Sequence, residues 1–170
     1  MRSAIASFTF SLLGSFGPTP IADVGRGVEI RESPGKGLGA FATDPMPEGS
    51  YLGRYTGVLR TPEEAIACFD AGETSSNYFA TIANGAEPLV IDAEDADTSA
   101  WPRYINHSLR RANCRNTELN LPFVLPGGLD LGKVSLGLYI RTLRDIEAGE
   151  ELLMDYGDYY WTSRGLAPMD

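Results

Sequence analysis

The chain has 170 residues, of which 43% are hydrophobic, 22% charged and 10% aromatic. This length suits a single ordinary domain, and apolar residues spread along the whole chain exclude an intrinsically disordered protein. The two cysteines, Cys68 and Cys114, exclude a disulfide-stapled scaffold. Together with the single histidine they leave too few ligands for a structural zinc site, which takes four Cys or His side chains, so we expect no metal.

The formal net charge of −9, from 14 basic and 23 acidic residues, argues against a nucleic-acid groove, because such a groove shows a basic patch. An acidic protein attracts cationic partners such as lysine-rich tails, although on charge alone we prefer the simpler interpretation that acidity keeps a small protein soluble. No segment reaches the ~18 uninterrupted apolar residues of a membrane span, so no membrane contact is expected.

The N-terminal segment differs in composition from the rest of the chain. Arg2 precedes AIASFTFSLLGSFG, and no acidic residue occurs before Asp23. A Ser-rich and acid-poor opening is compatible with a signal or transit peptide, but no clear cleavage site follows. We therefore interpret residues 1–25 as an irregular arm, with a targeting segment as the alternative.

Short apolar runs separated by Gly and Pro predict a mainly β domain. A hairpin is expected around Pro126-Gly127-Gly128, between strands at Asn116–Leu125 and Lys133–Leu143. Further strands are expected at Val28–Ile30, Tyr51–Leu59, Tyr78–Ala83, Leu89–Asp92 and Glu151–Met154.

Helical signals are scarce. Thr61-Pro62-Glu63-Glu64 is a capping box with proline at the first helical position, so it predicts a helix through AIACFDAG that ends at Gly72. A second short helix is expected at Thr98–Trp101.

Three blocks carry residues suited to chemistry. The segment Gly35-Lys36-Gly37-Leu38-Gly39 lacks the Lys-Ser/Thr ending of a phosphate loop and is followed by a strand and a turn, so it predicts a turn or a close backbone approach to a ligand. In Arg103-Tyr104-Ile105-Asn106-His107-Ser108 no nucleophilic triad is readable, but an amide and an imidazole share one turn. The third block, GEELLMDYG followed by DYYW, predicts either a core strand or an apolar, electron-rich channel.

In their order along the chain, these blocks resemble those of the SET-domain protein-lysine methyltransferases. GKGLGAFAT and YLGRYTGVL come first, Asn77-Tyr78-Phe79 then precedes VIDA, and RYINHS is followed by GLYIRTLRDIEAGEELLMDYG. Any one block is a weak signal, but NHS followed at this distance by GEEL and DYG is specific. The resemblance covers Val28 to Trp161, so we expect the domain at residues 26–161 and a C-terminal tail at 162–170.

The resemblance implies a β-clip-like SET fold, with small curved sheets around a C-terminal pseudoknot and short helical insertions. It also implies S-adenosyl-L-methionine on one face, a substrate lysine on the other, and a narrow channel between them. The implied catalytic residues are Tyr156, Tyr55 and Tyr78. The implied cofactor contacts are Lys36, Gly37, Leu38, Gly39, Tyr78, Arg103, Asn106, His107, Tyr156 and Trp161.

A tyrosine-lined channel suits this reaction on physical grounds. Free lysine has a pKa of about 10.4, so supplying its neutral, nucleophilic form at pH 7 costs roughly 4 to 5 kcal/mol. These blocks contain no evident general base. Desolvation in an apolar channel and repulsion by a sulfonium cation both lower the pKa of the amine, and in-line alignment contributes the rest.

The chain departs from the family pattern at several places. Arg54 and Val58 stand where the family often has glutamate, and Leu109–Cys114 lacks the proline that usually follows NHS. The position two before Tyr156, commonly Tyr or Phe, holds Met154, which favours transfer of more than one methyl group.

The partner that the resemblance implies is a lysine-containing basic protein, a histone among the candidates, which places the protein in the nucleus. A plastid or another organelle is the alternative if residues 1–17 form a targeting segment. The alternative function is a catalytically inactive SET-fold module that binds basic peptides along a sheet edge.

Overall fold

The computed structural model describes residues 27–83, 87–124 and 130–168, without the side chains of residues 121–136. This part of the chain forms three small sheets with the strand orders β1-β2, β3-β9-β8-β10-β7 and β4-β6-β5, which confirms the prediction of a mainly β fold with small helical insertions. The strands are β1 (Val28–Ser33), β2 (Gly37–Ala42), β3 (Tyr51–Tyr55), β4 (Val58–Arg60), β5 (Phe79–Ile82), β6 (Leu89–Asp92), β7 (Asn106–His107), β8 (Cys114–Val124), β9 (Asp130–Thr142) and β10 (Leu153–Met154). The helices are α1 (Pro62–Asp70), the 3-10 helix η2 (Trp101–Tyr104) and α2 (Asp158–Thr162).

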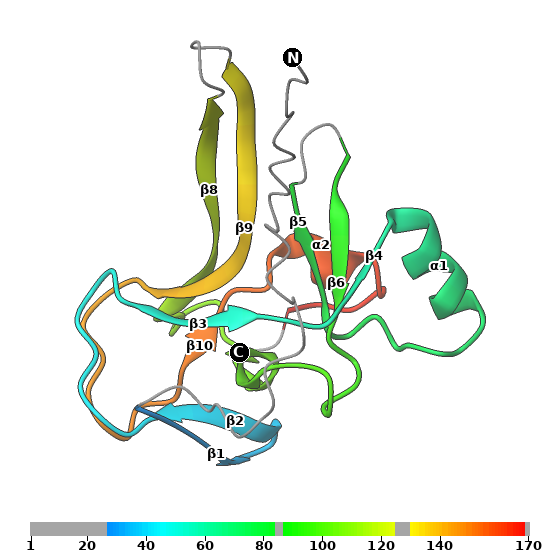
Figure 1. The fold of residues 1–170 in the computed structure, drawn as a ribbon. Coiled ribbons are helices and arrows are strands. Elements are labelled where there is room, and N and C mark those ends of the chain that lie inside the picture. Colours follow the sequence, from blue (N-terminus) through cyan, green and yellow to red (C-terminus); the bar gives the residue numbers. More distant parts are fainter. Residues whose placement is uncertain (1–26, 84–86, 125–129, 169–170) are drawn as a thin grey trace, which may run out of the picture.

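The longest strands, β8 and β9, pair antiparallel and rise as a hairpin from the body of the domain (Figure 1). This agrees with the hairpin that the sequence predicts, although the expected turn at residues 126–128 lies outside the described residues. At the base of the hairpin, β9 also pairs antiparallel with β3. The hairpin is therefore anchored through the five-stranded sheet.

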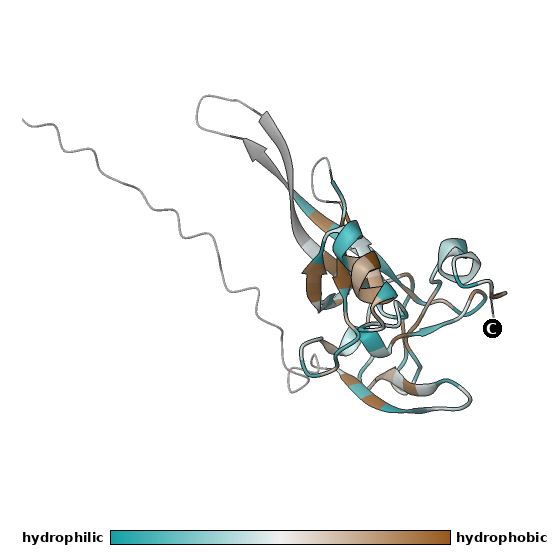
Figure 2. Ribbon diagram, turned by 90° about the vertical axis from the view of Figure 1, so that its right-hand side faces the viewer, coloured by the Kyte–Doolittle hydropathy of each residue, from teal (hydrophilic) through white to brown (hydrophobic). Residues whose placement is uncertain are grey.

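Two buried clusters hold the sheets together. Trp101, Ile105 and Ile140 belong to the larger one, which also takes up side chains from β1, β2 and β10. The smaller cluster lies between the five-stranded and the three-stranded sheet and includes Tyr55 and Ile91. Hydrophobic and hydrophilic residues are interspersed along the strands and helices (Figure 2). This pattern is expected where a small sheet covers the core with one face and meets water with the other.

The C-terminal segment is threaded between two earlier segments. Strand β10 pairs in parallel with β7 on one side and with β8 on the other. The connection between β7 and β8 is bonded to it: the N–H of Ser108 donates to the Met154 carbonyl oxygen at 3.1 Å, and that of Asn113 donates to the Leu153 carbonyl oxygen at 2.9 Å. The buried Asn113 side chain adds bonds to the Leu153 N–H and the Glu151 carbonyl oxygen. This threading is the pseudoknot that the resemblance implies.

Two turns of matching backbone geometry lie side by side beneath this knot. Met46 and Ile146 exchange backbone hydrogen bonds of 2.8 and 2.9 Å. Three residues further along, Gly49 and Gly149 both have positive φ (80° and 89°), and each N–H donates to the last residue of the strand that precedes the other turn. The turns after β2 and β9 therefore stabilise each other through backbone hydrogen bonds.

The prediction of one strand over Tyr51–Leu59 is wrong. The chain forms β3 and β4 instead, and these belong to different sheets. The break falls at Gly57, where a Cβ atom would lie 2.3 Å from the backbone carbonyl oxygen of Asp92. Only glycine permits so close a backbone approach, and the chain changes sheets there.

Helix α1 confirms the helix that the capping box predicts. The Thr61 hydroxyl accepts from the Glu64 N–H at 3.2 Å, and the Glu64 carboxylate accepts from the Thr61 N–H at 2.8 Å. The helix ends at Asp70, just ahead of Gly72 with its φ of 74°.

The short helix expected at Thr98–Trp101 is wrong in position, because η2 begins only at Trp101. The Thr98 and Ser99 hydroxyls donate to Asp95 instead, at 3.1 Å to its carboxylate and 2.7 Å to its carbonyl oxygen. Such local side-chain bonds compete with helix formation.

Two differences concern the C-terminal part. The strand expected at Glu151–Met154 is shorter, since β10 covers only Leu153–Met154 and Glu151 forms an isolated bridge with Phe41. Helix α2, which follows Gly157, was not expected from the sequence.

Candidate active site

A cavity of about 1060 Å³ lies between α1, η2, α2 and the segments around β5 and β10. Four of the expected catalytic and cofactor-binding residues line it: Tyr55, Tyr78, Arg103 and Tyr156. They come from the end of β3, the residue before β5, η2 and the segment after β10. A cavity of this volume is large enough for a small-molecule ligand.

The knot positions Tyr156 by two hydrogen bonds. Its hydroxyl donates to the Ile105 carbonyl oxygen at 2.6 Å, and its backbone N–H donates to Nδ1 of His107 at 3.1 Å. Because Nδ1 accepts this bond, the imidazole is the neutral tautomer with its proton on Nε2. The half-exposed Asp155 carboxylate lies 3.9 Å from the same Nδ1 atom.

Tyr55 belongs to the smaller core cluster, and Tyr78 packs against it. The Tyr55 hydroxyl donates to the Tyr78 carbonyl oxygen at 2.9 Å. Burial, reinforced by the neighbouring Tyr156, raises the pKa of Tyr55 well above its usual value. Burial and the nearby Tyr160 raise the pKa of Tyr156 in the same direction. Both phenols are therefore neutral at physiological pH and act as hydrogen-bonding dipoles rather than as bases.

Arg103 holds the ring of Tyr78. Its guanidinium donates to the carbonyl oxygens of Ala93 and Glu94, at 2.9 and 2.8 Å. The guanidinium carbon lies 4.1 Å from the centroid of the Tyr78 ring. A cation is thus held at the cavity wall by backbone carbonyls and an aromatic face.

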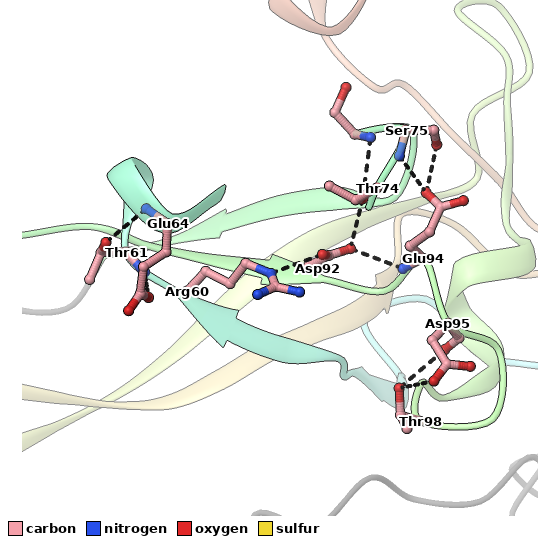
Figure 3. A network of polar contacts seen from close by, with 10 residues as sticks. Arg60, Thr61, Glu64, Thr74, Ser75, Asp92, Glu94, Asp95 and Thr98 are labelled. Atoms are coloured by element: carbon pink, nitrogen blue, oxygen red, sulfur yellow. Dashed lines mark hydrogen bonds and ion pairs between the residues drawn. The ribbon is translucent and has the colours of Figure 1, made fainter. Parts of the chain in front are cut away.

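A buried carboxylate orders the loop that leads to Tyr78 (Figure 3). Asp92, only 4% exposed, accepts from Arg60 at 3.0 Å, from the Thr74 hydroxyl at 3.3 Å and from the Glu94 N–H at 3.1 Å. Glu94 in turn accepts from the N–H and the hydroxyl of Ser75. Residues 74 and 75 are thereby tied to the end of β6.

A second group of the expected residues lies where the β1-β2 hairpin meets β7. The Lys36 ammonium donates to the His107 carbonyl oxygen at 2.6 Å. The Asn106 amide donates to the Leu38 carbonyl oxygen at 3.1 Å and to the Glu151 carboxylate at 2.9 Å. The structure thus brings the glycine-rich segment and the NHS block together.

Gly39 is closely surrounded by side chains where these segments meet. A Cβ atom on Gly39 would lie 2.7 Å from the Glu151 carboxylate and 3.0 Å from the Asn106 amide. Gly37 and Leu38 line a second, smaller hollow on the hairpin. This hollow shares no lining residue with the large cavity, so the channel implied by the resemblance stays a prediction.

Four aromatic rings connect the two groups, and we call His107, Tyr156, Tyr160 and Trp161 the aromatic cluster. The Trp161 ring centroid lies 4.8 Å from that of His107 and 5.0 Å from that of Tyr160, and Tyr160 lies 4.7 Å from Tyr156. Trp161 is 7% exposed, and its indole N–H has no acceptor within the described part of the chain. The cluster therefore packs the C-terminal helix α2 against the NHS block.

Three residues around this site are absent from the expected catalytic and cofactor-binding sets. Ile105 contributes a backbone carbonyl, which has no side-chain signature, although it lies inside the RYINHS block. Tyr160 belongs to the aromatic run that ends at Trp161, and this run was a usable signal. Arg164 also lines the cavity, but no recognised motif contains it.

Two kinds of feature are absent from the part of the chain that the structure describes. No three His, Cys, Asp or Glu side chains in residues 27–83, 87–124 and 130–168 gather as a metal-ligand group. Within the same ranges, no helix has the length and apolar character needed to cross a membrane.

The fold and the site define a class of protein: a knotted, mainly β domain in which the Asn-His strand β7 and the Tyr-Gly segment after β10 meet beside a tyrosine-lined cavity. Residues 37–157 match the model of one family, described as the SET domain. The chain belongs to the SET domain family, as the resemblance in its sequence predicts.

Known relatives carry the same domain. The chain is 32% identical over 135 residues to N-lysine methyltransferase KMT5A-A of Danio rerio, covering 78% of this chain and 36% of that protein. It is 29% identical over 154 residues to histone-lysine N-methyltransferase PRDM16 of Mus musculus, covering 82% and 11%. With histone-lysine N-methyltransferase MEDEA of Arabidopsis thaliana it shares 30% identity over 157 residues, covering 84% and 20%. The matched region is thus well under half of each relative.

Proposed function

We propose that this protein transfers methyl groups from S-adenosyl-L-methionine to the side-chain nitrogen of lysine in a protein substrate. The observation that carries the proposal is the cavity wall, where Tyr55, Tyr78 and Tyr156 gather. The Tyr55 hydroxyl donates to the Tyr78 carbonyl oxygen, and the Tyr156 hydroxyl donates to the Ile105 carbonyl oxygen. The names of the relatives, which are lysine methyltransferases, support the same reaction.

The polar groups where the glycine-rich segment meets the NHS block fit the cofactor. The Lys36 ammonium and the Asn106 amide suit its carboxylate, and the carbonyl oxygens of Leu38 and His107 suit its amino group. The indole N–H of Trp161, buried without an acceptor in the described part of the chain, suits a ring nitrogen of adenine. When bound, the cofactor supplies an electrophilic methyl group on a positively charged sulfur.

The protein's own contribution is to make the lysine amine neutral and to hold it in place. Burial raises the pKa of Tyr55 and Tyr156, which supports a cavity wall that solvates charge poorly. The same desolvation lowers the pKa of an amine that enters it, and the Arg103 guanidinium at the wall repels an ammonium. No general base is needed, and the tyrosine hydroxyls and the carbonyls of Tyr78 and Ile105 orient the neutral amine.

The side chain beside the reacting nitrogen bears on the number of methyl groups. Met154, 7% exposed, lines the cavity two residues ahead of Tyr156. Its thioether has no O–H with which to hold a water molecule against the amine. We therefore propose that a methylated amine can stay and react again.

The proposed substrate is a lysine-containing basic protein, with histones among the candidates and the nucleus as the compartment. The net charge of −9 favours such a partner, and several relatives are named histone-lysine N-methyltransferases.

Calorimetry with S-adenosyl-L-methionine and a radiolabelled methyl-transfer assay test the proposal. The assay uses a core histone mixture and a panel of basic peptides, with mass spectrometry to count the methyl groups added. We expect heat of cofactor binding and label in at least one substrate. Absence of cofactor binding, combined with binding of basic peptides, would support the inactive module instead.

A further inference from the structure

Helix α2 is too short to hold its own position. It has five residues, and its N-cap, Gly157, offers no side-chain cap. Helices shorter than about 12 residues are marginal on their own in water. Yet α2 carries Tyr160 and Trp161, which pack against Tyr156 and His107. The geometry of this side of the cavity therefore depends on tertiary contacts that anchor α2.

Arg164 makes such contacts on both sides of the cavity. On the α2 side, its guanidinium donates to the Tyr160 carbonyl oxygen at 2.7 Å and lies 3.9 Å from the centroid of the Tyr160 ring. On the other side, it donates to the carbonyl oxygen of Ser76, to the Ser76 hydroxyl at 3.2 Å and to the Asn77 side-chain oxygen at 3.4 Å. All four residues line the cavity.

The loop that receives Arg164 is also held by bonds in which Arg164 takes no part. Ser76 has a φ of 60°, a left-handed conformation that non-glycine residues rarely adopt. The bonds of Thr74 to Asp92 and of Ser75 to Glu94 hold the loop in this shape. Its acceptors face a planar, multi-donor guanidinium, a geometry that the single ammonium of lysine does not reproduce.

We propose that Arg164 is a positioning residue that ties α2 to the loop of residues 75–77 and thereby sets the spacing between the two tyrosine-bearing walls. It acts on Tyr156 through the Tyr160 ring, and on Tyr78 through its neighbour Asn77. Without the tie, the walls separate and water enters. The catalytic part of this inference rests on the proposed function, whereas the tie itself does not.

The tie is tested by two measurements that do not depend on enzymatic activity. Arg164→Met and Arg164→Lys are compared with the wild type and with Arg144→Met, a control that removes a half-exposed arginine paired with Glu150 outside the cavity. We expect acrylamide quenching of tryptophan fluorescence to rise at least about twofold in Arg164→Met, since Trp161 becomes accessible while Trp101, 2% exposed, stays buried.

Hydrogen exchange followed by mass spectrometry locates the change. In Arg164→Met, peptides covering residues 74–78 and 158–166 should exchange at least about tenfold faster, with Arg164→Lys intermediate and Arg144→Met unchanged. Unchanged quenching and exchange in Arg164→Met would overturn the tie. If that variant fails to fold, the same comparison is made with Arg164→Lys.

The kinetic arm tests the consequence for catalysis. With a methylated peptide identified, we expect kcat to fall at least about tenfold in Arg164→Met, its pH optimum to move upward as the amine becomes better solvated, and Arg164→Lys to recover part of the loss. An unchanged kcat and pH profile would refute the positioning role. If the wild type shows no transfer at all, the proposed function fails, and quenching and exchange still decide on the tie.

Discussion

At the scale of single residues, Tyr156 shows how the knot positions a side chain at the cavity wall. Its backbone is held by His107 and its hydroxyl by the Ile105 carbonyl oxygen, both on the segment that β10 passes beneath. Burial keeps the phenol protonated, so that its value lies in a fixed dipole rather than in proton transfer. Such preorganised groups act where charge changes during a reaction.

Replacing this hydroxyl should separate catalysis from binding. In Tyr156→Phe we expect kcat to fall about 100-fold or more, because one oriented donor at the reacting centre is lost. The free energy of unfolding should fall by about 1 kcal/mol, because the Ile105 carbonyl loses its partner. Radiolabel transfer, cofactor calorimetry and urea denaturation measure kcat, cofactor affinity and stability, and cofactor affinity should fall far less than kcat because the ring of residue 156 is kept.

Tyr51→Phe is the matched control, since Tyr51 is 49% exposed and does not line the cavity. It should leave all three quantities unchanged. Retention of full activity in Tyr156→Phe would remove the role assigned to Tyr156.

The stability of the protein in acid should depend on a second residue, Glu150. Its bonds to Arg144, at 2.7 and 3.1 Å, lower the pKa of its carboxyl below the usual value. A carboxyl whose pKa is lower in the folded state stabilises the protein above its unfolded pKa of about 4.3, and this contribution is lost as the pH falls through the folded pKa. Because the pair is partly exposed, we expect less than about 1 kcal/mol.

Thermal melts of Glu150→Gln at pH 7 and pH 3 test whether this stabilisation is present at neutral pH and lost in acid. The variant should melt below the wild type at pH 7, and the two should converge at pH 3. The exposed Glu48, replaced by Gln, serves as the control. A difference that grows toward pH 3 would show that the pair does not act in this way.

At the scale of elements, helix α1 forms from a local sequence signal, whereas helix α2 and the strand boundary at Gly57 depend on contacts with distant residues. Helix α1 has its own start signal in the capping box of Thr61 and Glu64. Helix α2 has none, and it forms where the rings of Tyr160 and Trp161 find partners in the knot. The strand boundary at Gly57 likewise depends on Asp92, which is 35 positions away in the chain.

The cap of α1 can be tested without activity. Thr61→Ala should lower the free energy of unfolding by about 1 kcal/mol, because the Glu64 N–H loses its acceptor. Thr61→Ser keeps the hydroxyl and should lie close to the wild type. Urea denaturation measures both, and equal stability of the two variants would mean that the capping box contributes nothing here.

At the scale of the whole molecule, the charge of −9 should act on the encounter with substrate. For a lysine-rich peptide, we expect kcat/KM to fall severalfold as ionic strength rises from about 0.02 to 0.3 M, because salt screens the attraction. For a peptide with one lysine and neutral neighbours, it should change little. Initial rates at low substrate concentration measure both, and the same salt dependence for the two peptides would exclude steering by charge.

The sequence by itself determines the family, the mainly β character and the features with local causes. The order of its blocks, the cap at Thr61 and the paired runs of the hairpin all act between near neighbours or through whole motifs. Only the tertiary structure decides the division of residues 51–59 between two sheets, the helix at 158–162 and the bonds that join Tyr156 to His107 and Arg164 to Ser76. The physical reason is sequence separation: these contacts link residues 49 and 88 positions apart, so they exist only after the chain has threaded and packed.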